Sequence, residues 1–239
     1  MAFLTLDVAL PLPTRLRDAA VRASDACAGR IDSAFRLGRP YPGLPDDEVC
    51  EPHVSLFMLR LHESRVNELL GAVSGVAARS TPVRAQGERW RPNPQGAPEL
   101  HFRASPGWGV LQEQVVAAVA PLRDGLRERD PAGDSPAELI DRLRRQDPGG
   151  SRLAQLERYG YDEIAERFSP HVTVAWPRSR SGDGAPPGPE PSFWQGDLTR
   201  IGVYRMAPHG TCVRPFGVFP LSGEKLTPTR VIKTGGAFR

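Results

Sequence analysis

The sequence lacks any long apolar run. A transmembrane helix needs about 18–20 consecutive apolar residues, whereas the longest candidate here, Val54 to Leu59, has the length of a strand. The segment from Met1 to Pro13 has no basic residue ahead of its apolar stretch and carries Asp7 within it, unlike a secretory signal. We therefore expect a strand in this segment, no membrane span and no membrane partner.

Cysteine and lysine are both scarce. The three cysteines, Cys27, Cys50 and Cys212, form no CxxC pair and no metal-binding spacing. Disulfide frameworks use even sets of cysteines, so this set indicates reduced thiols and a cytoplasmic location. Only two of the 31 basic residues are lysines, and no basic run has the length of a nucleic-acid-binding arm. The net charge of +3 leaves nucleotides and anionic metabolites open as ligands.

The motifs of several common enzyme classes are also missing. There is no GxSxG, no Gly-rich phosphate loop and no GxGxxG, and His62-Glu63 lacks the second histidine of HExxH. These absences disfavour a serine hydrolase, a P-loop NTPase, a Rossmann oxidoreductase and a zinc protease.

The chain has 239 residues, and its hydrophobic fraction of 39% is too high for a disordered protein. An insertion is expected at 128–150, where Ser135 to Glu138 form a capping box, and a mobile loop at the Pro- and Gly-rich 177–191. Helices between pairs of strands indicate an α+β fold with mainly antiparallel sheets. Periodicity predicts strands at 3–10, 53–61, 81–90, 99–104, 171–176, 197–206 and 212–221, and helices at 13–35, 64–78, 109–127, 135–145 and 151–168, the last with a break at Gly160.

One phrase occurs twice, once in each half of the chain. Pro-His-Val-[Ser/Thr]-apolar stands at 52–56 and again at 170–174. Residues i and i+2 of a strand share a face, so His53 and Ser55 point one way, as do His171 and Thr173. A single histidine before a strand is usually structural. Two copies with the same flanks indicate a shared active site.

These residue types suit phosphodiester chemistry. Two imidazoles on opposite sides of a scissile P–O bond form an acid–base pair, because imidazole titrates near neutral pH. One removes a proton from water and the other protonates the leaving oxygen. The hydroxyls of Ser55 and Thr173 can donate to phosphoryl oxygens and hold the group in line. Nothing in this arrangement requires a metal, and the sequence does not decide which histidine is the acid.

Paired His-x-[Ser/Thr]-apolar motifs, one per half, resemble the two-histidine (2H) phosphoesterase superfamily. That group includes 2′-5′ RNA ligase-like proteins and cyclic nucleotide phosphodiesterases. The resemblance implies one domain over residues 1–239, with two pseudo-twofold-related lobes around a central cleft. It implies His53 and His171 as catalytic residues and Ser55 and Thr173 as phosphate-binding residues.

Three further residues are candidates for substrate binding. In the strand at 99–104, His101 and Arg103 alternate with apolar residues, so they either face the cleft or lie on an exposed edge face. Tyr204 alternates with Arg205, so one of the two can reach the cleft. Trp90 between two arginines either stacks on a nucleotide or supports a turn.

The sequence therefore predicts a cytoplasmic, monomeric enzyme that hydrolyses or transfers a phosphodiester without a cofactor or metal. Its expected substrate is a cyclic phosphate or another phosphorylated small molecule, or an RNA or nucleotide. Two alternatives stay open. The fold can serve a biosynthetic pathway on a substrate without a phosphodiester, or the chain can bind RNA or nucleotides without turnover.

Overall fold

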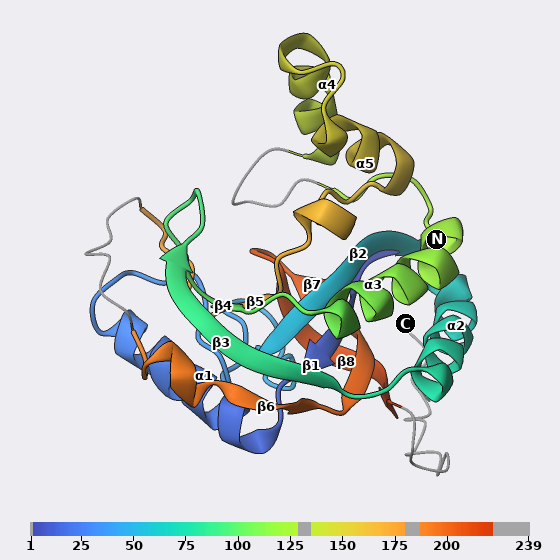
Figure 1. Cartoon of the computed structure of the whole chain (residues 1–239). Helices are drawn as coiled ribbons and strands as arrows, with labels where there is room; N and C mark the ends of the chain where they lie inside the picture. Colours follow the sequence, from blue (N-terminus) through green and yellow to red (C-terminus); the bar gives the residue numbers. More distant parts are fainter. Residues whose placement is uncertain (1, 129–134, 180–186, 222–239) are drawn as a thin grey trace.

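Two four-stranded antiparallel sheets form the framework of the protein (Figure 1). The structure is a computed structural model that describes residues 2–128, 135–179 and 187–221. The first sheet has the order β2 (His53–His62), β1 (Phe3–Pro11), β7 (Arg200–Ala207), β8 (Thr211–Pro220). The second has the order β5 (His171–Thr173), β4 (Pro98–Phe102), β3 (Val83–Pro92), β6 (Gln195–Leu198). The predicted α+β class with antiparallel sheets is confirmed.

Three helices pack on the sheets. Helix α1 (Thr14–Ala28) places Leu16 against Gly196 of β6. Helix α2 (Val66–Arg79) contacts β7 and β8, and α3 (Pro106–Val119) contacts α2, β2 and β3 (Figure 1). Their apolar faces and the inner faces of both sheets share one continuous core, because alternation in a strand places every second side chain on the covered face.

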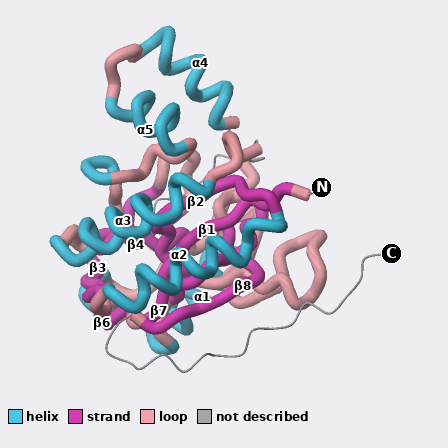
Figure 2. Tube along the Cα trace, turned by 90° about the vertical axis from the view of Figure 1, so that its right-hand side faces the viewer, coloured by secondary structure: helices cyan, strands magenta, loops and turns pink. Residues whose placement is uncertain are grey.

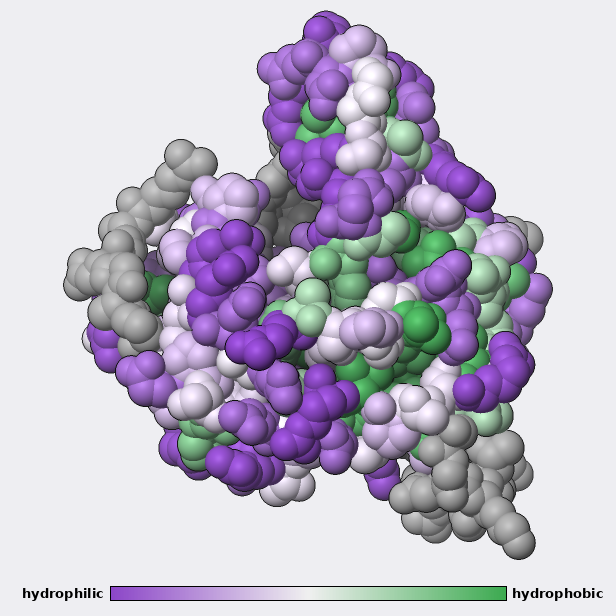
Figure 3. Space-filling view, viewed as in Figure 1, coloured by the Kyte–Doolittle hydropathy of each residue, from purple (hydrophilic) through white to green (hydrophobic). Residues whose placement is uncertain are grey.

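Two more helices stand away from this body. Helices α4 (Pro136–Gln146) and α5 (Ser151–Tyr159) project from one end of the molecule in both views (Figures 1 and 2). A small apolar cluster of Ile140, Leu153 and Leu156 holds them together, and the face that they present in Figure 3 is mostly hydrophilic. The predicted capping box is present, since Ser135 accepts from the Glu138 amide and Glu138 accepts from the Ser135 amide.

Several predicted boundaries are wrong, and local chemistry explains most of them. Helix α1 ends at Ala28 instead of continuing to residue 35, because Gly29 caps it. Helix α3 starts earlier, with Pro106 in its first turn, and ends at Val119, since Pro121 cannot continue an α-helix. The predicted break at Gly160 is confirmed, since α5 ends at Tyr159 and Gly160 caps it with a φ of +68° that favours glycine, but no α-helix follows as far as residue 168.

Two predicted strands also differ. The expected strand at 197–206 is split at Thr199 into β6 and β7, which belong to different sheets. Strand β5 stops at Thr173, well short of residue 176. The expected mobile loop falls partly, at 180–186, outside the described residues, as does part of the expected insertion, at 129–134. No helix among the described residues has the length and apolarity of a membrane span.

Helix α3 offers a matched test of the core. Val115 is fully buried, whereas Val110 is 53% exposed on the same helix. Val115→Ala should lower the free energy of unfolding by about 2 kcal/mol, from lost burial and a cavity. Val110→Ala should be neutral or stabilising by up to about 0.5 kcal/mol, because alanine is the better helix former. Urea denaturation measures both, and equal effects would contradict this packing.

Candidate active site

The two repeated motifs lie on edge strands of different sheets. Strand β2, with His53, ends the first sheet, and β5, with His171, ends the second, and the two strands contact each other. The motifs therefore lie neither on central strands nor on neighbouring strands of one sheet. The edge position allows β2 and β5 to contact each other. Each of them pairs with a neighbour on one side only, so its other edge is free to lie beside the other sheet.

Strand alternation divides the motif residues as predicted. Val54, Leu56, Val172 and Val174 are all at most 1% exposed. The side chains of His53, Ser55, His171 and Thr173 lie on the opposite faces and line one cleft of about 790 Å³. The sequence thus brings both histidines and both hydroxyls to the same cleft.

We call the sheet β2-β1-β7-β8 with its helices the first lobe, and the sheet β5-β4-β3-β6 with its helices the second lobe. Each lobe repeats one unit that includes an acid. Asp7 lies on β1, which pairs with the β2 of His53, and Glu99 lies on β4, which pairs with the β5 of His171. A helix follows the acid-bearing strand in both lobes. Sequence reasoning missed both acids as site residues. The available signal was an acidic residue on the face of a strand opposite its apolar residues, as Asp7 is between Leu6 and Val8.

Backbone carbonyls orient both imidazoles. His53 Nδ1 donates to the Glu51 carbonyl oxygen at 2.6 Å, and His171 Nδ1 donates to the Ser169 carbonyl oxygen at 2.8 Å. A carbonyl only accepts, so the proton is on Nδ1 and Nε2 is the atom left for chemistry. Nε2 of His53 lies 3.8 Å from Asp7 Oδ2, and Nε2 of His171 lies 3.7 Å from Glu99 Oε1.

The two hydroxyls bind the same acids. Ser55 Oγ donates to Asp7 Oδ2 at 2.6 Å, and Thr173 Oγ1 donates to Glu99 Oε1 at 3.4 Å. Each lobe therefore presents a carboxyl group that lies close to both a histidine and a hydroxyl. The hydroxyl hydrogen reaches a substrate oxygen only if it turns away from the carboxylate.

The electrostatics of the first lobe favour neutral groups. Asp7 is fully buried, and this burial raises its pKa to about 7 against the lowering effect of Ser55 and Cys212. Burial also lowers the pKa of His53 to about 4, although the Glu51 carbonyl opposes the shift. Close to neutral pH, His53 is thus an unprotonated imidazole.

The second lobe favours charged groups. Burial would lower the pKa of His171, but Glu99, Glu163 and the Ser169 carbonyl together raise it. Burial would raise the pKa of Glu99, but His101 and His171 outweigh this and lower it. The two lobes therefore repeat the same residue types in opposite electrostatic states.

The cleft extends beyond these groups. Four arginines line it, Arg91, Arg127, Arg152 and Arg167, and arginine suits phosphate recognition. Two aromatic side chains, Trp176 and His209, also line the cleft, with their ring centroids 5.4 Å apart. His209 Nδ1 lies 2.9 Å from the Tyr41 hydroxyl oxygen. His209 has φ of +66°, which is uncommon outside glycine.

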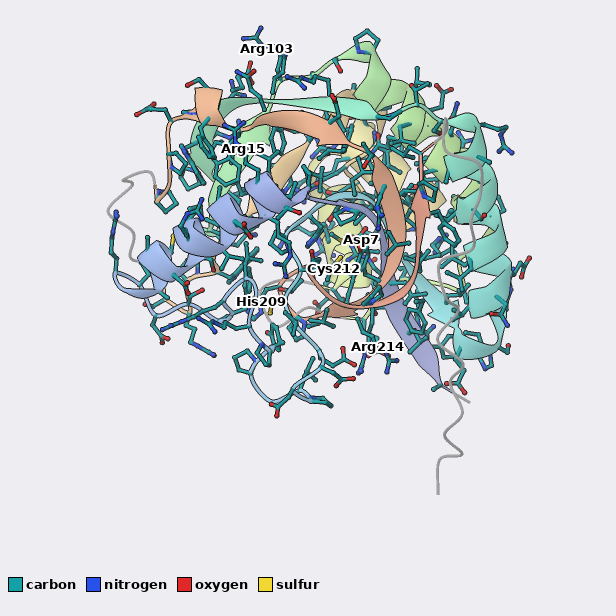
Figure 4. The ribbon with its side chains drawn as sticks, turned by 90° about the horizontal axis from the view of Figure 1, so that it is seen from below. Asp7, Arg15, Arg103, His209, Cys212 and Arg214 are labelled. Carbon is teal, nitrogen blue, oxygen red and sulfur yellow. The ribbon has the colours of Figure 1, made fainter. Side chains whose placement is uncertain are left out.

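Of the three further candidates for substrate binding, one lines the cleft and two do not. His101 lines the cleft and is 2% exposed. Arg103 does not reach the cleft, because β4 ends at Phe102 and the side chain projects outward into a groove with Gln86 (Figure 4). Tyr204 does not reach it either, since it is buried against Ala9 and Cys212.

Trp90 supports a turn. Its indole Nε1 donates to the Pro189 carbonyl oxygen at 3.1 Å, and its ring meets Trp194 edge to face. Of its two arginine neighbours, Arg91 lines the cleft.

No family model matches the sequence, and no curated protein matches it. Solved structures are similar. TT0787 of Thermus thermophilus aligns with a TM-score of 0.52 at 20% identity, over 93% of this chain and 100% of TT0787. E. coli LigT complexed with 3′-AMP aligns with a TM-score of 0.52 at 15% identity, over 93% of this chain and 99% of LigT. The chain shares the fold of these structures, so the predicted resemblance is confirmed for the fold.

The buried Asp7 generates a prediction about stability and pH. Its pKa is 3.8 when unperturbed and about 7 in the folded chain. Between these values the folded state holds a proton that the unfolded chain has lost, so stability falls as pH rises through this window. Asp7→Asn removes the carboxyl group. Its free energy of unfolding relative to the unsubstituted protein should therefore rise from pH 4 to pH 8 by on the order of 4 kcal/mol.

Thermal melts of both proteins across this pH range measure the difference. Asp18→Asn is the matched control, because it removes an exposed carboxyl group on α1 that water already solvates. A difference between Asp7→Asn and the unsubstituted protein that stays constant with pH would contradict the buried, protonated state of Asp7.

Proposed function

We propose that this chain is a 2H-type phosphoesterase that hydrolyses or transfers a phosphodiester without a metal. One observation carries the proposal: two imidazoles, each fixed by a backbone carbonyl so that Nε2 is available, line one cleft, each beside a hydroxyl. A binding protein has little need for two matched proton-transfer groups. The shared fold with LigT supports the proposal, since LigT was solved with 3′-AMP and with phosphate.

We assign His53 as the base and His171 as the acid. His53 is the neutral imidazole, because burial lowers its pKa to about 4, so its Nε2 can accept a proton from water. The water oxygen then forms a bond to phosphorus as the bond to the leaving oxygen breaks, and His171 gives its Nε2 proton to that oxygen. The reverse roles operate in the second half of a transfer reaction.

The substrate we propose is a cyclic phosphate or another nucleotide-derived phosphodiester. Four arginines line the cleft, of which Arg152 is paired with Asp162, and the rings of Trp176 and His209, tilted by 57° to each other, each offer an aromatic face. Aromatic stacking holds bases of any sequence. Asp7 also serves this binding step: in its protonated form it donates to Ser55 Oγ, and the Ser55 hydrogen is then free to turn to a phosphoryl oxygen.

Removal of either imidazole should reduce turnover strongly. His53→Ala and His171→Ala should each lower kcat on a nucleoside 2′,3′-cyclic phosphate by roughly 10²–10⁴-fold, the usual contribution of a general acid or base. The double variant should be far from additive, because the two groups act as a unit. His62→Ala is the matched control, since His62 ends the same strand as His53 outside the cleft residues. Near-normal turnover in either active-site variant would refute the assignment.

The mechanism needs no cation. Turnover should therefore persist in excess chelator, measured on the same substrate after exhaustive dialysis. A loss of turnover in chelator that a divalent ion reverses would show that the proposed proton transfers between His53, water and His171 are not sufficient.

A further inference from the structure

Three potential metal ligands converge in the second lobe. Glu99 Oε2 lies 3.2 Å from His101 Nε2, and Glu99 Oε1 lies 3.7 Å from His171 Nε2. The ligand atoms of the three side chains all lie within 4.8 Å of one another. Around a tetrahedral zinc ion with bonds of about 2.0–2.1 Å, ligand atoms are about 3.4 Å apart. Small side-chain movements therefore suffice to bind an ion.

The pairing of β4 with β5 creates this arrangement. Glu99 and His101 are two residues apart on β4, so they share a face, and His101 stands directly opposite His171 on β5. All three ligands thus come from one rigid pair of strands. A metal site built on strands is positioned more precisely than one built on loops.

Ser169 orients the imidazoles of His101 and His171 through their Nδ1 atoms. Its carbonyl oxygen accepts from His171 Nδ1, and its hydroxyl oxygen lies 3.0 Å from His101 Nδ1. Both rings therefore direct Nε2 toward Glu99. Metal-binding histidines nearly always have such a partner on the second nitrogen, which fixes the ring and its tautomer.

His101 Nε2 is buried within ion-pair distance of Glu99 Oε2 but without a well-directed hydrogen bond among the described residues. The side chain is 3% exposed. Two imidazole nitrogens and a carboxylate converge here, and each imidazole nitrogen offers an electron pair once its Nε2 proton is removed. A proton or a metal cation between them relieves their repulsion.

Among the described residues, the corresponding group of the first lobe is less suited to an ion. Pro11 stands opposite His53 where His101 stands opposite His171. The remaining cluster of Asp7, His53 and Cys212 includes two fully buried groups, and burial raises the pKa of both Asp7 and Cys212. An ion would have to displace two tightly held protons there.

We propose that Glu99, His101 and His171 bind one divalent transition-metal ion, such as Zn²⁺ or Co²⁺. Two imidazoles and one carboxylate suit these ions better than Mg²⁺ or Ca²⁺. All three residues line the cleft, so the fourth coordination position is open to it. The consequence for activity rests on the proposed function: the ion occupies the Nε2 electron pair of His171 and displaces its proton, so binding inhibits the phosphoesterase reversibly.

Metal binding can be measured without reference to activity. Co²⁺ is added to the full chain, purified without a polyhistidine tag and freed of metal, and the visible d–d absorption is recorded. Zn²⁺ calorimetry gives affinity and stoichiometry. We expect one ion per chain and an intense four- or five-coordinate Co²⁺ spectrum. His101→Gln should weaken Zn²⁺ binding by more than about 100-fold, because loss of a mere outer-shell partner already costs roughly 10–100-fold.

Two variants complete the test. Ser169→Ala removes the hydroxyl behind His101, keeps all three ligands and should weaken Zn²⁺ binding by roughly 10–100-fold. If His101→Gln is too unstable to be measured, Ser169→Ala tests the site in its place. His62→Gln, which removes a histidine outside the cluster, should leave the affinity unchanged. An unchanged affinity in His101→Gln and Ser169→Ala, or a six-coordinate Co²⁺ spectrum, would overturn the site.

Turnover is then measured with and without saturating Zn²⁺. The rate of each variant with Zn²⁺ is compared with the metal-free rate of the same variant. We expect inhibition that chelator reverses. Tight binding at this site with unaffected turnover would leave the metal site standing and refute His171 as the acid. Absence of binding in a protein whose turnover depends on both histidines would refute the metal site and leave the proposed function standing.

Discussion

The pairing of an acid-bearing strand with a histidine-bearing edge strand is the constraint on which the site depends. Strand alternation sends Val54 and Val172 into the core and leaves His53 and His171 on the open faces. The carbonyl two residues before each histidine then holds Nδ1, so backbone geometry alone fixes which nitrogen is available. Because both units end at sheet edges, the two lobes present these nitrogens to one cleft.

The repetition is structural, and the differences between the two units are chemical. Asp7 is fully enclosed, so burial dominates and raises its pKa to about 7. Glu99 has His101 and His171 as neighbours, and their polar interactions with the carboxylate, that of His101 first, outweigh burial and lower its pKa. The enclosed Asp7 thus lies beside a neutral His53, whereas Glu99 lies between the imidazoles of His101 and His171. In our proposed mechanism, this difference gives one imidazole the role of base and the other the role of acid.

The sequence predicted the antiparallel α+β fold from short-range periodicity, and the repeated motif predicted that His53, Ser55, His171 and Thr173 share one site. It did not predict Asp7 or Glu99 as site residues, since their proximity to the histidines arises only when β1 pairs with β2 and β4 with β5. Arg103 was expected near the cleft by alternation, but alternation holds only while a strand continues, and β4 ends one residue earlier. The split between β6 and β7 was likewise invisible, because the periodicity of two consecutive strands does not reveal that they join different sheets.

The same reasoning explains why the sequence showed no metal-binding spacing. Glu99 and His101 are only an alternating pair until β5 brings His171 opposite them. Once together, three electron-pair donors need positive charge between them, and either a proton or a metal ion can supply it. A proton leaves His171 as the proposed acid, whereas an ion withdraws that proton. In our two proposals, proton transfer and metal binding are therefore alternative uses of one cluster, and the concentration of free metal decides between them.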